Sequence, residues 1–421
     1  MFKVFFASYG SLFIKLLIGI VITPYLISFG DRYVIYTTVL SLFSFLNYAD
    51  LGIGAAVGVL ASQNWKINPS LSLSYFLHYL RVVFVTYIVF IVLMCILILW
   101  PEIIFARYDS ELARTYIASG IILGSNVLIA KVLSLYYNSQ GRNTARYIHI
   151  SFGVLTICWG LVVFKVLSED ILVYILTVHT CQIIVNVYWL RRVYKECVDA
   201  ELLLSDIKKE LTRFSRSNIL RLVFWIFLFE LDRVFLVRFL DEQSMYLFSV
   251  GYVFFVYARL ANSAYFGVVK PEVNSLPKGL VGKALLRYTL IYMIVSVSAI
   301  IVFHQFGPYI LSYWLRINSV DLHHIVLHFL GFWCLSGVAN ALVIQSDNDG
   351  RYSLAVYGSM FGFCVAVGYI LLNRSLEGYL TARSLYVVGQ IVFLILIKIK
   401  GNFHEEGLCI LSTAISRNGR E

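Results

Sequence analysis

The stretch VVFVTYIVFIVLMCILIL, residues 82–99, decides the fold class of this chain. It contains no charged residue, and its apolar residues do not alternate with polar ones as in a strand of a membrane β-barrel. A helix needs roughly 20 apolar residues to cross the hydrocarbon core of a bilayer. Because backbone amides cannot be left unpaired in hydrocarbon, this run predicts a membrane-spanning helix.

The composition of the whole chain points the same way. Of its 421 residues, 60% are hydrophobic and only 14% are charged, whereas a soluble domain carries about 25% charged residues. The net charge is +10, but the Lys and Arg residues lie mainly between apolar runs, which argues against a nucleic-acid partner. Most of the seven cysteines lie inside apolar runs, as small free hydrophobic residues do. We therefore predict an all-α polytopic membrane protein.

About twelve apolar segments are long enough to span the bilayer. We expect spans near residues 8–29, 33–61, 79–100, 113–137, 147–166, 170–190, 217–240, 244–268, 285–305, 323–345, 352–372 and 377–398. The fifth and sixth spans are separated by a short polar turn at Asp170, which predicts a tight helical hairpin. Lys and Arg are more frequent in the loops on the side of the N-terminus, so the positive-inside rule predicts that both termini are cytoplasmic.

A basic, amphipathic segment lies at the middle of the chain, with six predicted spans on either side. We expect it to form a helix on the inner membrane surface. The predicted domains are an N-terminal six-helix lobe at 1–190, the cytoplasmic linker at 191–216, a C-terminal six-helix lobe at 217–398 and a cytoplasmic tail at 399–421.

A weak internal repeat relates the two halves. When the chain is shifted by about half its length, Leu, Asp and Tyr residues of the first half fall on identical residues of the second; the pairs are Leu26 and Leu236, Asp31 and Asp241, and Tyr36 and Tyr246. Both halves begin with a cytoplasmic entry, so the repeat is parallel, and a path for cargo is expected between the halves.

Charged side chains inside apolar spans are costly and mark either function or internal pairing. The candidates for substrate binding or cavity charge are Lys15, Asp50, Lys131, Glu230, Asp232, Arg233 and Arg259. Lys131 lies near the inner end of its span, from which its side chain can extend to the membrane surface. Asp50 precedes Leu-Gly and could cap a broken segment of the second span.

The strongest cluster lies in the seventh span. Glu230 and Arg233 are three residues apart, so on a continuous helix they share a face and can pair. Asp232 points elsewhere and needs a partner, for which Arg259 and Lys15 are the candidates. The cluster either fixes packing as a buried ion network or lines a water-filled cavity with charge.

The remaining polar residues carry weaker signals. We expect His179, in the sixth span, to be packed and hydrogen-bonded to its neighbours. His323, His324 and His328 lack the partners of a metal site, so we expect no metal. The chain has no phosphate-binding loop of the G-x-x-x-x-G-K-[ST] type and no catalytic constellation, so we expect neither ATP hydrolysis nor an enzyme. Transport would then draw on an ion gradient, such as one of H⁺ or Na⁺, on membrane potential, or on consumption of the product elsewhere, with no cofactor.

Three stretches resemble those of a known family. Residues 24–33, PYLISFGDRY, and 50–56, DLGIGAA, resemble the opening of Wzx-type polysaccharide flippases, and residues 231–236, LDRVFL, resemble their seventh helix. These flippases belong to the multidrug/oligosaccharidyl-lipid/polysaccharide (MOP) exporter superfamily.

The resemblance implies two six-helix lobes that open alternately to each side of the bacterial inner membrane. It implies a cationic cavity and, as cargo, the oligosaccharide repeat unit of an O-antigen or similar surface polysaccharide on undecaprenyl pyrophosphate. Membrane lipids, a polysaccharide polymerase and a chain-length regulator would be its partners.

Three alternatives remain. A multidrug or small-metabolite antiporter of the same superfamily shares the fold but needs no path for a lipid tail. A membrane polysaccharide polymerase usually has a large outer loop with several basic residues, whereas the longest expected outer loop, about residues 304–321, has only Arg316 as a strong base. A purely structural membrane scaffold leaves the charges of the seventh span unexplained.

Overall fold

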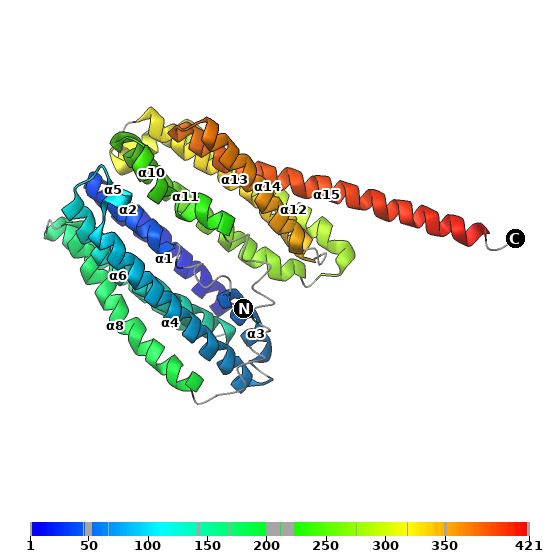
Figure 1. Cartoon of the computed structure of the whole chain (residues 1–421), viewed down its shortest axis with the longest axis horizontal. Helices are drawn as coiled ribbons and strands as arrows, with labels where there is room; N and C mark the ends of the chain where they lie inside the picture. Colours follow the sequence, from blue (N-terminus) through cyan, green and yellow to red (C-terminus); the bar gives the residue numbers. More distant parts are fainter. Residues whose placement is uncertain are drawn as a thin grey trace. The chain divides into compact units, whose positions relative to one another are not determined.

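The computed structural model of the chain describes residues 2–44, 46, 53–65, 67–140, 144–167, 170–198, 211, 223–274, 276–317, 319–348 and 352–418. Within these residues every regular element is a helix (Figure 1). The first half forms α1 (Phe2–Ile27), α2 (Asp31–Ser44), α3 (Ile53–Asn64), α4 (Pro69–Leu99), α5 (Glu102–Phe105), α6 (Ser110–Ser139), α7 (Thr144–Leu161), the π-helical turn η2 (Val162–Val166) and α8 (Ile171–Val198).

The second half begins with an interrupted helix and continues with long ones. Its elements are η3 (Ile226–Glu230), α10 (Asp232–Phe239), α11 (Glu242–Asn274), α12 (Lys278–Ile310), η4 (Leu311–Leu315), α13 (Val320–Asn348), α14 (Tyr352–Leu372) and α15 (Leu376–Asn418).

Eight helices of the described part are long and apolar enough to cross a membrane. They are α4, α6, α8, α11, α12, α13, α14 and α15. The apolar stretch at residues 82–99 lies in α4, whose most apolar window has a mean hydropathy of 3.2. Shorter apolar helices, Leu16–Ile27 and Ile150–Val166, lie in the predicted first and fifth spans. The predicted all-helical polytopic membrane fold is confirmed.

Several element boundaries differ from the prediction. Within the second predicted span the structure describes α2 and α3, and Asp50 falls between them in the sequence, outside the described residues. The expected outer loop at 304–321 is largely helical, because α12 continues to Ile310 and η4 to Leu315. The last helix continues past the predicted span into the tail, as far as Asn418.

The linker is described only at its start, as far as Val198, and at Leu211. Helix α8 extends to Val198, well into the predicted linker. Leu211 is 1% exposed and belongs to an apolar cluster with Val193 and Cys197 of α8. This leucine is therefore packed against protein rather than lying on the inner membrane surface. The expectation for the rest of the linker falls outside the described residues.

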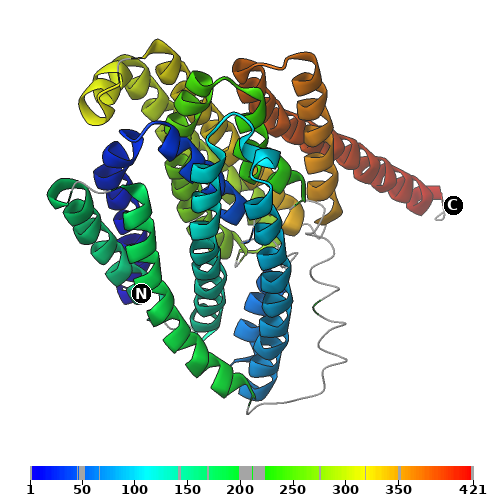
Figure 2. The same cartoon turned by 60° about the vertical axis from the view of Figure 1, so that its left-hand side comes forward.

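The chain divides into two compact units. Unit 1 is Met1–Leu260 with Phe303–Val326, and unit 2 is Ala261–Val302 with Leu327–Glu421. In unit 1, α6 packs against α2, α4 and α8, and α1 packs against α7 (Figure 2). In unit 2, α14 packs against α15. The predicted lobes at 1–190 and 217–398 stay a prediction.

The sequence explains where the helices begin. Asn68 caps α4: its Oδ1 accepts a hydrogen bond of 3.1 Å from the Leu71 amide, and Pro69 occupies the first turn. Asp241 does the same before α11, where the Ser244 amide and hydroxyl donate bonds of 2.9 and 2.6 Å. The bond from the Ser244 hydroxyl is the main reason that the pKa of Asp241 is lowered.

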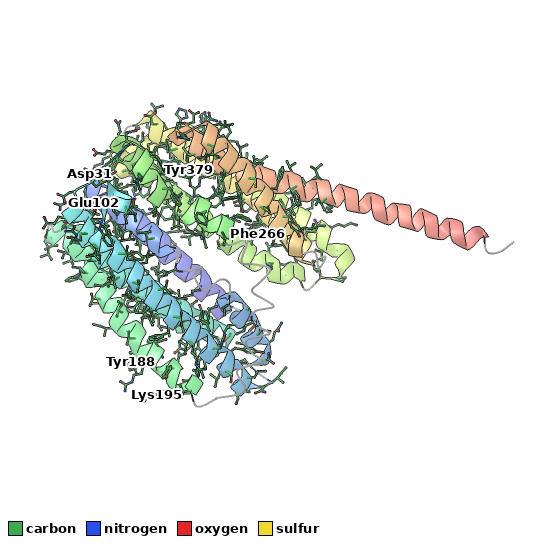
Figure 3. All side chains as sticks on the ribbon, in the orientation of Figure 1. Asp31, Glu102, Tyr188, Lys195, Phe266 and Tyr379 are labelled. Carbon is green, nitrogen blue, oxygen red and sulfur yellow. The ribbon has the colours of Figure 1, made fainter. Side chains whose placement is uncertain are left out.

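Apolar and aromatic side chains cover much of the surface, as a lipid-facing protein requires. On α8, Tyr188 is 66% exposed, and both Tyr188 and Lys195 project away from the neighbouring helices (Figure 3). Lys195 lies in the last turn of α8, where its cation complements the helix dipole.

Two glycines allow α14 and α15 to approach closely in unit 2. A Cβ atom at Gly362 would lie 2.2 Å from the Tyr386 carbonyl oxygen, and one at Gly389 would lie 3.0 Å from Gly362 Cα. Small residues at a helix contact let backbones meet, which drives helix association in membranes.

We predict that Gly362→Ala separates α14 from α15 and destabilises the detergent-solubilised protein by about 1–3 kcal/mol. Gly368→Ala on the same helix is the matched control, because a Cβ atom there meets nothing within 4 Å. Thermal unfolding followed by size-exclusion chromatography measures both. Equal melting temperatures for the two variants would contradict the close contact.

Candidate functional site

The charges of the seventh span lie at a break in the helix. The chain forms a π-helical turn, in which the Leu231 amide bonds to the Ile226 carbonyl at 2.9 Å, and α10 begins afresh at Asp232. The seventh span is therefore interrupted at Leu231, between Glu230 and Asp232, whereas the sequence analysis treated it as one helix. Single-turn π segments are frequent at functional sites.

Glu230 pairs with Arg259 of α11. The Glu230 residue is 3% exposed, whereas the Arg259 side chain is 31% exposed. Trp225 completes the group: its indole nitrogen lies 3.4 Å from Glu230 Oε1, and its ring lies 5.5 Å from the Arg259 guanidinium carbon. The predicted pair of Glu230 with Arg233 is wrong, because the break at Leu231 removes the three-residue register on which it depended.

Asp232 is the first residue of α10 and is 1% exposed. Its Oδ1 accepts a hydrogen bond of 2.8 Å from the Arg233 amide. A carboxylate in the first turn of a helix is stabilised by the positive end of the helix dipole. The break thus supplies Asp232 with backbone donors that a continuous helix would have used internally.

Arg233 lies among aromatic rings. Its guanidinium carbon is 4.0 Å from the centre of the Tyr252 ring, and the Tyr252 hydroxyl donates a bond of 2.7 Å to the Phe229 carbonyl. The charge of Arg233 also acts on the phenols of Tyr33 and Tyr36 of α2, which packs against α10. The sequence identified Arg233 but gave no sign of these tyrosines, which are distant in the chain.

The Arg233 side chain retains donors. Its Nε is buried without a hydrogen-bond partner in the part of the chain that the structure describes, whereas its two terminal nitrogens are not completely buried. A guanidinium can donate bidentate hydrogen bonds to a phosphate or carboxylate. The group therefore has the chemistry of an anion-binding side chain.

The other predicted site residues are not all described. Asp50 lies outside the described residues, and for Lys15 the structure describes the backbone on α1 but not the side chain. Lys131 is partly exposed on α6. The structure therefore brings together Glu230, Arg259 and the residues that flank the break.

A second buried arginine escaped the sequence analysis. Arg383 of α15 is 1% exposed in unit 2, and its guanidinium carbon lies 5.2 Å from the centre of the Phe329 ring and 5.7 Å from that of Tyr379. Cation–π contact is one way to hold such a charge away from water.

We predict that Arg259→Gln destabilises the protein by at most about 3 kcal/mol, because Glu230 is left buried without its ion partner. Changing both residues to Gln should recover most of this loss. Arg192→Gln is the control: it breaks an exposed pair with Glu196, with side chains 61% and 43% exposed, and should cost about 0.5 kcal/mol. Thermal unfolding of the unmodified protein, Arg259→Gln, Glu230→Gln and the double variant gives the coupling energy, and no recovery in the double variant would refute it.

Solved structures with this fold are membrane transporters. A multidrug resistance MATE family transporter of the MOP superfamily in its inward-facing conformation superposes with a TM-score of 0.67, at 14% identity over 95% of this chain and 98% of that one. An outward-facing structure with the same description gives 0.60, at 15% identity over 96% and 94%.

A third structure comes from Pyrococcus furiosus, a MOP superfamily transporter described as having a binding pocket of reverse polarity that suggests a different function. Its TM-score is 0.56, at 13% identity over 96% of this chain and 94% of that one. No protein-family model matches the sequence, and no curated protein matches it closely enough to count as a relative. The chain thus has the fold of the MATE transporters of the MOP superfamily.

Proposed function

We propose that this chain is a membrane transporter that works by alternating access and that its cargo is an oligosaccharide carried on undecaprenyl pyrophosphate. Its place would be the bacterial inner membrane, with both termini in the cytoplasm, beside a polysaccharide polymerase and a chain-length regulator. The shared fold supports the transporter part of this proposal. The cargo is inferred from the sequence stretches around Asp50 and Asp232 and from the chemistry at the helix break.

The cargo proposal is based on a difference between the two acidic residues and Arg233 in the groups that each contacts. Glu230 is engaged by Arg259, and Asp232 lies at the N-terminus of α10. Arg233 instead contacts a neutral ring and keeps terminal nitrogens that are not completely buried. A pyrophosphate needs such donors to offset the loss of its hydration, whereas a cationic drug needs an accessible carboxylate.

The tyrosines around Arg233 position it rather than contact the cargo. Tyr33 and Tyr252 are 2% and 4% exposed, so they shape the surroundings of Arg233 and are too buried to stack on a sugar.

The second candidate function is multidrug or small-metabolite antiport. The descriptions of the solved structures favour it, since several are multidrug resistance or MATE transporters. The transporter from Pyrococcus furiosus, however, is described by a binding pocket of reverse polarity. The fold thus accommodates more than one charge in its binding pocket, and the cargo of this chain depends on its own residues.

We predict that the protein, reconstituted in vesicles, flips a fluorescent undecaprenyl-pyrophosphate oligosaccharide and that Arg233→Gln lowers the rate about tenfold or more, as expected for the loss of a hydrogen bond to a charged group. Arg233→Lys should retain part of the rate, because it keeps the charge without the planar guanidinium. Arg374→Gln, an exposed arginine between α14 and α15, should leave the rate unchanged.

Efflux of the cationic dye ethidium is measured from the same vesicles. Efflux of the dye without movement of the lipid-linked sugar would replace the proposed cargo with the second candidate. If Arg233→Gln flips the lipid-linked sugar as fast as the unmodified protein does, Arg233 does not line the path of the cargo.

A further inference from the structure

A network of neutral polar side chains lies between α6, α7 and α8 of unit 1, away from the helix break. Helices α6 and α8 run side by side (Figures 1 and 2). The network contains one ionisable side chain, His179 of α8, as the sequence analysis expected of a packed histidine. Its other members are Asn126, Thr156, Gln182 and Asn186.

The backbone carbonyl of His179 fixes the orientation of the network. Asn126 Nδ2 lies 2.9 Å from this oxygen, which can only accept, so the atom is correctly a nitrogen. The same nitrogen lies 3.2 Å from Gln182 Oε1, which by the same reasoning is an oxygen. Asn186 donates to Asn126 Oδ1 at 3.1 Å, which agrees with this orientation.

The tautomer of His179 follows from this orientation. His179 Nδ1 lies 3.0 Å from Gln182 Oε1, and because that oxygen only accepts, Nδ1 carries the proton. The other end of the Gln182 amide lies 3.5 Å from the Thr156 hydroxyl, which donates its own proton to the Phe152 carbonyl at 2.7 Å. In the neutral ring, Nε2 is therefore the basic atom.

The surroundings of His179 contain no charged contact in the part of the chain that the structure describes. Its ring contacts are to Asn126 of α6 and Gln182 of its own helix, and Nε2 is not completely buried. Titratable side chains on the helices packed around it include Tyr87 of α4, which is bound to Ser125, Lys131 of α6, Cys158 of α7 and Cys181 of α8 itself, which is exposed.

The same hydrogen bonds disfavour a metal cation. Gln182 Oε1 accepts from two N–H groups and Asn126 Oδ1 from one, so together they keep a single lone pair for a cation. A hard cation such as Na⁺ needs several such oxygens, whereas a single proton needs one basic nitrogen.

We propose that His179 is the proton-binding site through which this transporter couples to a proton gradient. The lone pair of Nε2 takes one proton from a hydronium ion and releases water, while Nδ1 keeps its own proton and its bond to Gln182. The resulting imidazolium places a positive charge in a helix interface that is otherwise neutral, which changes the relative stability of helix arrangements. The coupling rests on the proposed transport function, but the proton site does not.

The proton site is tested on the full-length protein in lipid nanodiscs by ¹⁵N NMR of labelled histidines. His179→Asn assigns the signal among the eight histidines. We expect Nδ1 to be protonated at every pH and Nε2 to gain its proton as the pH falls from about 8 to about 4. A proton on Nε2 throughout, or no titration in this range, overturns the proposal.

The coupling is tested in vesicles with the lipid-linked sugar and ethidium. A gradient of one pH unit can bias a cargo coupled to one proton by about tenfold. We expect this bias in the unmodified protein and in the control Cys181→Ala. His179→Asn should lose the bias but keep exchange without a gradient, because the Asn amide replaces the Nδ1 donor and lacks Nε2.

The outcomes separate the two proposals. A bias that persists in His179→Asn overturns the coupling role, whichever cargo moves. If the unmodified protein moves neither cargo, the proposed function fails, and the NMR titration still decides whether His179 binds a proton.

Discussion

The ion pair between Glu230 and Arg259 is the interaction on which the rest of the candidate site depends. A carboxylate that is 3% exposed inside a membrane protein is stable as an anion only if a cation and hydrogen-bond donors lie close to it. Arg259 and Trp225 provide both. Since Arg259 pairs with Glu230, Arg233 does not pair with that carboxylate and instead contacts the ring of Tyr252. The electrostatic character of the site follows from that division.

The interruption of the helix at Leu231 allows Glu230 and Arg233 to contact different partners. On an uninterrupted helix, Glu230 and Arg233 would face one another and neutralise each other. The π-helical turn rotates the chain before α10 begins, so the two charges have different neighbours. The same interruption exposes backbone amides at the start of α10, and Asp232 uses one of them. A local change of backbone therefore separates three adjacent charges into three different environments.

The sequence predicted the helices well and the environment of the charges only in part. A run such as residues 82–99 can only form a helix in hydrocarbon, because its backbone N–H and C=O groups must hydrogen-bond to one another. The identity of the charged residues at the break was also evident, since charge in an apolar run is conspicuous. The pairing was not, because a three-residue spacing implies a shared face only where the helix is continuous. The tyrosines of α2 and the His179 network depend on contacts between helices that are distant in the chain, which spacing within one helix cannot predict.

The cost of burying Glu230, Arg233, Arg383 and His179 is offset in three different ways, and the difference bears on what each residue can do. Glu230 is compensated by an opposite charge, so a cargo must displace Arg259 before the carboxylate can bind it. The guanidinium groups of Arg383 and Arg233 lie over aromatic rings, which compensate a buried cation. His179 is neutral in the hydrogen-bonding pattern that fixes its tautomer, and it can gain charge without breaking a bond of the network. A carboxylate held by an arginine suits a structural role, an arginine held by rings suits binding of an anion, and a histidine held by amides suits reversible uptake of a proton.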